Sequence, residues 1–145
     1  MPEHISWDES LSVQSKEIDG QHRQFFRVIN TICDMLRHGR TRQGDLAMLL
    51  ERLREYAFYH FATEEDYFDR FGYEGRGAHA RQHDIFRARI REFISRGNDA
   101  AADRAALLRD IDEFARRWVT EHIRNEDSKC IAIFRLGNGL PPKEL

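Results

Sequence analysis

The sequence predicts an all-α protein, an antiparallel up-down-up-down four-helix bundle with an extended N-terminal arm and a short C-terminal helix. Four long segments carry apolar residues at three- and four-residue steps, which is the spacing of one helix face. The connections between these segments are short, and short connections favour antiparallel neighbours. With 145 residues, the chain is long enough to bury the core of one such domain.

We expect residues 1–145 to form a single domain. The arm is expected over residues 1–18, with Trp7 and Val13 packed on the bundle, the helical bundle over residues 19–136 and a tail over residues 137–145. Hydrophobic residues make up 41% of the chain and charged residues 33%, a composition typical of globular rather than disordered proteins.

Composition excludes several classes of function. The net charge is −2 and no block of lysine or arginine is present, which argues against nucleic acid as a partner. No apolar run approaches the ~20 residues that a membrane span needs, and the first residues lack the pattern of a secretory signal. Two cysteines, Cys33 and Cys130, suggest free thiols in a reducing compartment. A cytoplasmic protein is therefore expected.

The first helix is expected over residues 20–37. Asp19 stands directly before the periodic segment and is the expected N-cap. His38 and Gly39 should end this helix, because a residue that favours the helix dipole followed by glycine is typical of a helix C-terminus.

The remaining helices follow the same periodicity. The second is expected over residues 45–71, and the glycine-rich segment 72–77 should break it, since glycines favour a turn. The third is expected over residues 78–96 and the fourth over residues 101–125. A short helix is expected over residues 128–136, before the tail.

Polar residues occupy the apolar faces of all four helices, where a solvated helix would not place them. They are His22, His60, Glu64, His79, His83 and His122. A buried polar group without a partner costs ~1–3 kcal/mol, and a whole domain is stable by only ~5–15 kcal/mol. One histidine on such a face is more often a hydrogen-bonded core residue than a ligand, but five histidines with a carboxylate favour a shared metal centre.

Two metal ions are expected rather than one. Five imidazoles and a carboxylate exceed the four ligands of a closed zinc site, and carboxylates are the natural bridges between two ions. Glu126 and Asp127 are candidates for a second bridge. On a regular helix Glu126 would lie over His122, whereas Asp127 would be rotated by ~140°. Geometry alone therefore favours Glu126.

Several short motifs follow one another in a specific order, beginning with Trp7 in the arm. They are Ile18-Asp19-Gly20-Gln21-His22 with Phe26 and Asn30, His60-Phe61-Ala62-Thr63-Glu64-Glu65, Gly72-Tyr73, His79-Ala80-Arg81-Gln82-His83, and Trp118-Val119-Thr120-Glu121-His122-Ile123 followed by Asp127. A single HxxxE or HxxxH motif is weak evidence, but this series is specific. Over nearly its whole length the chain resembles a bacterial hemerythrin, a non-heme di-iron oxygen-binding protein.

The resemblance implies two iron ions per chain, Fe²⁺ or Fe³⁺, joined by a bridging oxo or hydroxo group. The implied ligands are His79, His83 and His122 on one iron, His22 and His60 on the other, and Glu64 and Asp127 as bridges between them. The choice of Asp127 overrules Glu126 and requires an irregular helix. We expect a π-bulge between His122 and Asp127.

By the same resemblance, one coordination position on the two-histidine iron stays vacant for dioxygen. The residues expected to line this oxygen pocket are Phe26, Phe61, Trp118, Val119 and Ile123. The family usually has leucine where Val119 stands, so a more open pocket with faster ligand exchange and autoxidation is expected. Cys130 replaces a residue that is often aromatic and is expected to be buried and inert. Glu65 is expected at the surface.

The function expected from the resemblance is reversible dioxygen binding, by a carrier, store or delivery protein that is not an enzyme. Five imidazoles with two carboxylates differ from the carboxylate-rich sites with paired Glu-x-x-His motifs of ferritin-like oxidases. The alternatives are an oxygen- or redox-sensing module, a di-iron enzyme acting on peroxide or nitric oxide, and, more distantly, a zinc or purely structural bundle. No signalling domain lies within these residues, which weakens the sensing hypothesis. We expect a monomer, with a protein partner that receives oxygen or a signal.

Overall fold

The computed structural model describes residues 2–143, so the ends of the predicted arm and tail, at Met1 and residues 144–145, lie outside the described residues. Its helical elements are η1 (Glu9–Leu11), α1 (Lys16–Arg37), α2 (Gln43–Phe71), α3 (Arg76–Gly97), α4 (Arg104–Trp118), the π-helical segment η2 (Val119–Arg124), the 3₁₀ turn η3 (Asp127–Cys130) and α5 (Ile131–Gly137). Residues 2–143 contain no strand, and the all-α class is confirmed.

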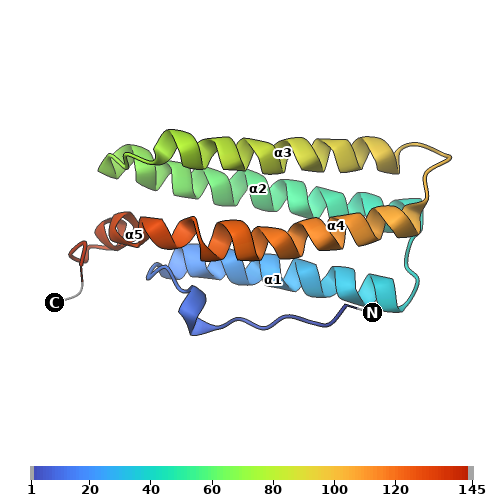
Figure 1. Cartoon of the computed structure of the whole chain (residues 1–145), viewed down its shortest axis with the longest axis horizontal. Coiled ribbons are helices and arrows are strands. Elements are labelled where there is room, and N and C mark those ends of the chain that lie inside the picture. The colour runs from blue at the N-terminus through green and yellow to red at the C-terminus, as the bar shows by residue number, and fades with distance from the viewer. Residues whose placement is uncertain (1, 144–145) are drawn as a thin grey trace.

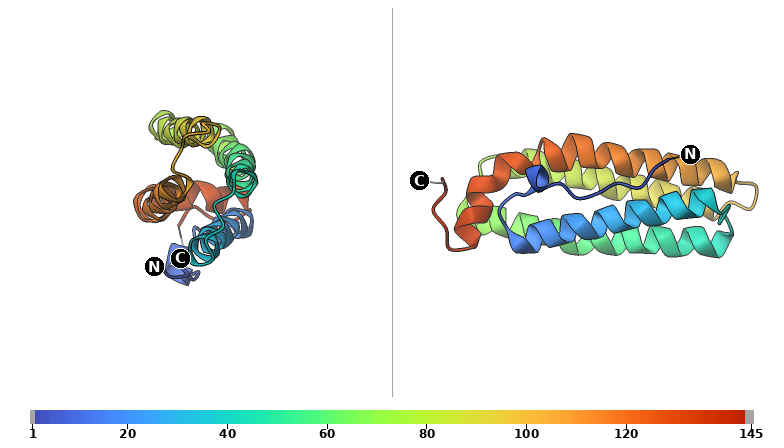
Figure 2. Two further views of the ribbon diagram at one scale, coloured as in Figure 1. Left: turned by 90° about the vertical axis from the view of Figure 1, so that its right-hand side faces the viewer. Right: turned by 90° about the horizontal axis from the view of Figure 1, so that it is seen from below.

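The four long helices lie side by side and alternate in direction (Figure 1). Helix α2 packs against α1 and α3, and α4 closes the bundle by packing against α1 and α3. The end-on view in Figure 2 shows the four columns, with the arm on the outside of α1 and α4. Helix α5 covers the end of the bundle at which α1 begins. The predicted up-down-up-down bundle with a short C-terminal helix is confirmed.

The start of α1 differs from the prediction, because Ser15 rather than Asp19 is the N-cap. The Ser15 side chain accepts a hydrogen bond from the backbone N–H of Ile18 at 3.3 Å. Asp19 lies inside the first turn and reaches back to the arm, where it accepts hydrogen bonds from the Val13 N–H at 2.9 Å and the Ser12 hydroxyl at 2.6 Å. The carboxylate thus fastens the arm to the helix.

Helix ends are predicted better than helix starts. Gly72 has φ 64° at the C-cap of α2, and Gly39 has φ 62° just after the C-cap His38 of α1, a backbone region that glycine enters without strain. Helices α2 and α3 begin slightly earlier than expected. Helix α4 begins later than expected, at the residue after Asp103, whose side chain accepts a hydrogen bond from the Ala106 N–H.

Two apolar clusters fill the bundle, and a polar layer separates them. The larger cluster contains Phe25 of α1 and Phe61 of α2, and the smaller one, beneath α5, contains Ile18 and Phe68 of the same helices. His22 stands between Ile18 and Phe25 in the sequence of α1. The polar layer therefore lies inside the bundle, covered by apolar residues on both sides.

The arm packs on the bundle as predicted. Trp7 meets Phe26 edge to face at 5.6 Å between ring centroids, and Val13 is buried in the smaller apolar cluster. The backbone of Ile5 exchanges two hydrogen bonds with the side chain of Asn30, at 2.8 and 2.9 Å. Among the described residues, no helix is long and apolar enough to cross a membrane.

Candidate metal centre

Seven side chains meet in the polar layer between the two apolar clusters, and none is more than 2% exposed. They are His22 of α1, His60 and Glu64 of α2, His79 and His83 of α3, His122 of η2 and Asp127 of η3. These are the seven residues that sequence analysis assigned to metal. Four helices and the turn after η2 each bring part of the set to one level of the bundle.

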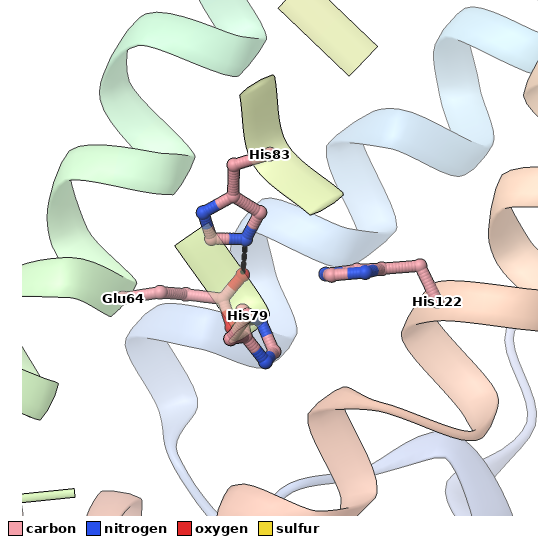
Figure 3. Close-up of side chains that lie close together, drawn as sticks. All are labelled: Glu64, His79, His83 and His122. Atoms are coloured by element: carbon pink, nitrogen blue, oxygen red, sulfur yellow. Dashed lines mark ion pairs between the residues drawn. The ribbon is translucent and has the colours of Figure 1, made fainter. Parts of the chain in front are cut away.

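The seven residues form two groups that share one carboxylate. The first group is Glu64, His79, His83 and His122, and the second is His22, His60, Glu64 and Asp127; within each group the ligand atoms lie within 4.8 Å of one another. Figure 3 shows the three rings of the first group and the carboxylate of Glu64 turned toward a common space. Each group has the donors that a first-row metal ion binds.

Both carboxylates reach across the two groups. Oε1 of Glu64 lies 2.7 Å from Nε2 of His60, and Oε2 lies 3.6 Å from Nε2 of His79. Oδ2 of Asp127 lies 3.0 Å from Nε2 of His22, and Oδ1 lies 2.9 Å from Nε2 of His79. Each carboxylate therefore occupies the position of a bridge between two ions.

The inward-facing atoms of this cluster lack hydrogen-bond partners. Nε2 of all five histidines and both oxygens of Glu64 and Asp127 are buried without an aligned hydrogen bond, although the nitrogen–oxygen distances are as short as 2.7 Å. The atoms approach one another but point at a shared space rather than along donor–acceptor lines. Leaving this many polar groups unsatisfied would cost ~1–3 kcal/mol each. Cations at the centre of each group would satisfy them, so the residues fit a dinuclear metal site.

The electrostatics also favour positive charge in the cluster. Burial alone would raise the pKa of Glu64, but the neighbouring histidines, His60 first, outweigh it and hold that pKa well below its usual range. Burial and the charge of Glu64 oppose ionisation of Asp127, yet His122 and His22 still lower its pKa. Burial would lower the pKa of His79, but Asp127 and other partners raise it to about 12. Both carboxylates are therefore anionic and need cations around them.

Two glutamines orient the histidines from outside the cluster. Nδ1 of His60 donates to the Gln21 side-chain oxygen at 2.6 Å, and Nδ1 of His122 donates to the Gln82 oxygen at 2.7 Å. These bonds leave Nε2 of each ring free to face a metal ion, as is usual for metal-bound histidines. Sequence analysis gave neither glutamine a role. Each directly precedes a ligand of its own helix, and the ~100° rotation between adjacent residues turns it toward the neighbouring helix.

Glu65 is a further partner that sequence analysis missed. This residue was expected at the surface, but its side chain is only 21% exposed. The carboxylate accepts hydrogen bonds from Nδ1 of His83 at 3.0 Å and from the guanidinium of Arg87 at 3.2 Å. Nδ1 of His79 lies 3.8 Å from the sulfur of Cys130, whose buried thiol donates to a backbone carbonyl. The outer contacts are therefore of three kinds: an amide oxygen for His60 and His122, a carboxylate for His83 and a thiol for His79.

The predicted helix irregularity is present but begins earlier than expected. A π-helical segment, η2, spans Val119–Arg124 and includes His122, whereas the bulge was expected between His122 and Asp127. In π geometry the residue five positions on, rather than four, lies over a given residue. Asp127 therefore joins the cluster, and Glu126 pairs with Lys129 at 3.1 Å near the surface. The π segment begins at Val119, about two helical turns ahead of Asp127, the ligand that it repositions.

Aromatic rings pack directly on the histidines. Phe61 stacks on His83 with 3.9 Å between ring centroids, and Trp118 stacks on His122 at 4.0 Å. Tyr56, which sequence analysis did not select, stacks on His60 at 5.0 Å. These rings hold the imidazoles in place and keep water away from the cluster.

The other expected pocket residues take different places. Ile123 is buried in the larger apolar cluster. Phe26 and Val119 line a cavity of about 390 Å³ beneath the arm, together with Ile5 and Leu11. Because residues of the arm form one wall and residues of α1, α4 and η2 form the other, this cavity lies between the arm and the bundle.

Comparison with known proteins agrees with this arrangement. The family described as the hemerythrin HHE cation binding domain matches residues 13–133. A bacteriohemerythrin of Pseudomonas aeruginosa is 31% identical over 135 residues, which cover 91% of this chain and 82% of the relative. A bacteriohemerythrin of Clostridium acetobutylicum is 27% identical, covering 86% of this chain and 97% of the relative. A hemerythrin-like protein of Naegleria gruberi is also 27% identical, covering 89% and 92%.

Proposed function

This chain belongs to the hemerythrin family, a di-iron, oxygen-binding family, and on that premise we propose that it binds dioxygen reversibly and carries, stores or delivers it. The observation that carries the proposal is the pair of buried ligand groups that share Glu64. The proposed ligands are His79, His83 and His122 for one iron, His22 and His60 for the other, and Glu64 and Asp127 for both. When bound, the iron pair supplies two electrons to dioxygen and recovers them on release.

The surrounding residues suit binding without further reaction. Three aromatic rings cover the histidines, and the whole cluster is sealed from solvent. Gln21 and Gln82 hold their imidazoles by neutral amides, which supply no proton for a following step. A ligand set of five imidazoles and two carboxylates stabilises ferrous iron more than a carboxylate-rich set does, because the neutral nitrogens add no negative charge. We therefore propose a binding protein rather than an enzyme.

The decisive experiment is an anaerobic ferrous sample exposed to oxygen and then returned to argon. We expect two irons per chain and near-ultraviolet oxo-to-iron bands that appear with oxygen and disappear without it. Bands that form once and never reverse would overturn the proposal. Sustained consumption of peroxide or nitric oxide by the loaded protein would favour an enzyme instead.

One observation favours oxygen sensing as a second candidate. Trp7 of the arm packs on Phe26, and Phe26 lines the same cavity as Val119, the first residue of the π segment η2. A change at the metal centre could therefore reach the arm through these side chains. Hydrogen exchange measured on the arm in the oxygen-free and oxygen-bound protein tests this function. Equal protection of the arm in both states would contradict it.

The proposal extends to the location and assembly of the protein. We propose a cytoplasmic location, because Cys33 and Cys130 are both buried free thiols of the kind that persist in reducing compartments. We also propose that the protein is a monomer. Sedimentation of the iron-loaded protein tests the monomer, and a dimer at micromolar concentration would contradict it.

A further inference from the structure

The five histidines differ in the charge of their outer partners. His60 and His122 donate through Nδ1 to neutral amide oxygens, and Nδ1 of His79 lies near a thiol. Nδ1 of His22 is buried without a partner. Among the Nδ1 atoms of these five described rings, only that of His83 meets a carboxylate, that of Glu65 at 3.0 Å. One negative charge is thus attached to one side of the cluster.

Arg87 holds this carboxylate in place. Its guanidinium donates to the same Glu65 oxygen at 3.2 Å and to Asp84 at 2.8 Å. The guanidinium also lies over the ring of Phe61, 5.1 Å from its centroid, and Phe61 in turn stacks on His83. Glu65 therefore accepts hydrogen bonds from both His83 and Arg87, and its side chain is only 21% exposed.

A carboxylate that accepts a hydrogen bond from a metal-bound imidazole makes that imidazole a more basic ligand, which donates more electron density to the metal. A charged acceptor does this more effectively than an amide, because hydrogen bonds to ionised groups are roughly twice as strong. A more basic ligand stabilises the ion of higher charge, so it favours Fe³⁺ over Fe²⁺. The group that contains His83 should therefore favour the ferric ion more than the group that contains His22 and His60.

We propose that Glu65 is a positioning residue that acts through His83. It keeps the proton of His83 on Nδ1, which leaves Nε2 for the metal, and it gives the His79, His83 and His122 site the lower reduction potential of the two. A one-electron-oxidised centre then carries its ferric ion at that site. This inference rests on the proposed function only for the identity of the metal as iron.

The chain contains its own matched control. Glu65→Gln replaces the carboxylate by the amide already present at His122, and Gln82→Glu makes the opposite exchange within the same three-histidine group. We expect Glu65→Gln to weaken the preference of the three-histidine site for ferric over ferrous iron about tenfold. This change corresponds to a rise of about 59 mV in the one-electron reduction potential of that site. Gln82→Glu should shift the potential downward, and the double variant should return near the parent value.

A zinc-loaded sample provides a readout that needs neither iron nor oxygen. We expect ¹H–¹⁵N NMR to find a slowly exchanging Nδ1 proton on His83 in the parent protein, shifted downfield by its hydrogen bond to Glu65, and expect Glu65→Leu to lose both the downfield shift and the slow exchange. Zinc affinity should fall about tenfold in Glu65→Gln, within the range typical of outer-partner changes at metal sites. Because both measurements use a redox-inactive ion, they remain informative if the protein binds no oxygen.

The possible outcomes distinguish the inferred role of Glu65 from the proposed oxygen-binding function. If Glu65→Gln leaves the potential and the zinc affinity unchanged but lowers the unfolding temperature, Glu65 is a structural ion pair with Arg87 and the inference is wrong. If the potential shifts as expected but oxygen binding is irreversible, the inference stands and the proposed function fails. A shift of the potential in the same direction in both single variants would also overturn the inference, since it would reflect perturbation rather than charge.

Discussion

Oδ2 of Asp127 lies 3.0 Å from Nε2 of His22, although the two residues stand near opposite ends of the chain and neither side chain is exposed. Asp127 belongs to the turn after the π segment, and His22 belongs to the first helix. Their contact closes the second ligand group and ties the last helix of the bundle to the first. The cluster thus depends on tertiary contacts at its centre, not only on local motifs.

Replacing Glu64 by alanine should remove metal before it removes structure. Glu64 is the residue common to both ligand groups, while the surrounding helix is held by apolar contacts on either side. We expect Glu64→Ala to keep its far-ultraviolet circular dichroism and to lose most of its bound iron, measured as irons per chain. Glu126→Ala is the control, because Glu126 pairs with Lys129 outside the cluster. Full iron occupancy in Glu64→Ala would contradict the shared role.

Enlarging Val119 should slow autoxidation. Val119 lines the cavity beneath the arm and directly follows Trp118, which stacks on His122. Our hypothesis is that its small side chain leaves a route by which water and ligands reach the iron pair, and that leucine would narrow it. We expect Val119→Leu to slow both oxygen release and the conversion to inactive diferric protein, followed by absorbance. An unchanged autoxidation rate would sink the hypothesis.

Loading metal into the metal-free protein should release protons. Burial lowers the pKa of His22, His79 and His83, but the nearby carboxylates outweigh it and raise the pKa of each above 6.5. The imidazole of His79, with its pKa raised to about 12, is therefore protonated near pH 7, His22 and His83 hold a proton more readily than a free imidazole, and a metal binds only the neutral form. We expect zinc uptake to acidify a weakly buffered solution and zinc affinity to rise with pH. Uptake without proton release, read by a pH indicator, would contradict the raised pKa values.

Removing the Tyr56 hydroxyl should not destabilise the protein. This hydroxyl is buried without a hydrogen-bond partner, and burial followed by the charges of Glu64 and Asp127 raises its pKa well above the usual value. We expect Tyr56→Phe to leave the free energy of unfolding unchanged or raise it by up to about 1 kcal/mol in urea titrations. Tyr67→Phe is the control and should lose about 0.5–1.5 kcal/mol, because the Tyr67 hydroxyl donates to Glu17 at 3.3 Å. A clear loss in Tyr56→Phe would indicate a partner in solution.

The ligand pairs within single helices were predictable because their geometry is local. His79 and His83, like His60 and Glu64, stand four residues apart, so any regular helix places each pair on one face. Burial of that face follows from the apolar residues around it. The bundle itself follows from four such faces joined by short connections.

Asp127 marks the limit of that local reasoning. A regular helix favours Glu126, and only the resemblance to a known family selected Asp127, which the structure places in the cluster. The π segment that repositions it starts at Val119, ahead of the predicted place. Hydrogen bonding along a helix can shift register at a small energetic cost, so the position of the irregularity depends on packing against neighbouring helices rather than on the residues between His122 and Asp127.

The sequence by itself determined the fold class, the helices and the five histidines with Glu64 on their inner faces, because periodicity and burial act within each helix. Only the tertiary structure decided which other residues contact these helices and histidines. Asp19 ties down the arm instead of capping a helix, and Glu65 contacts His83 instead of solvent. Both contacts depend on the rotation of one segment about its axis and on its shift along that axis relative to the segment packed against it. No single segment's pattern encodes that relationship, because it arises only when the packed helices fix their mutual positions.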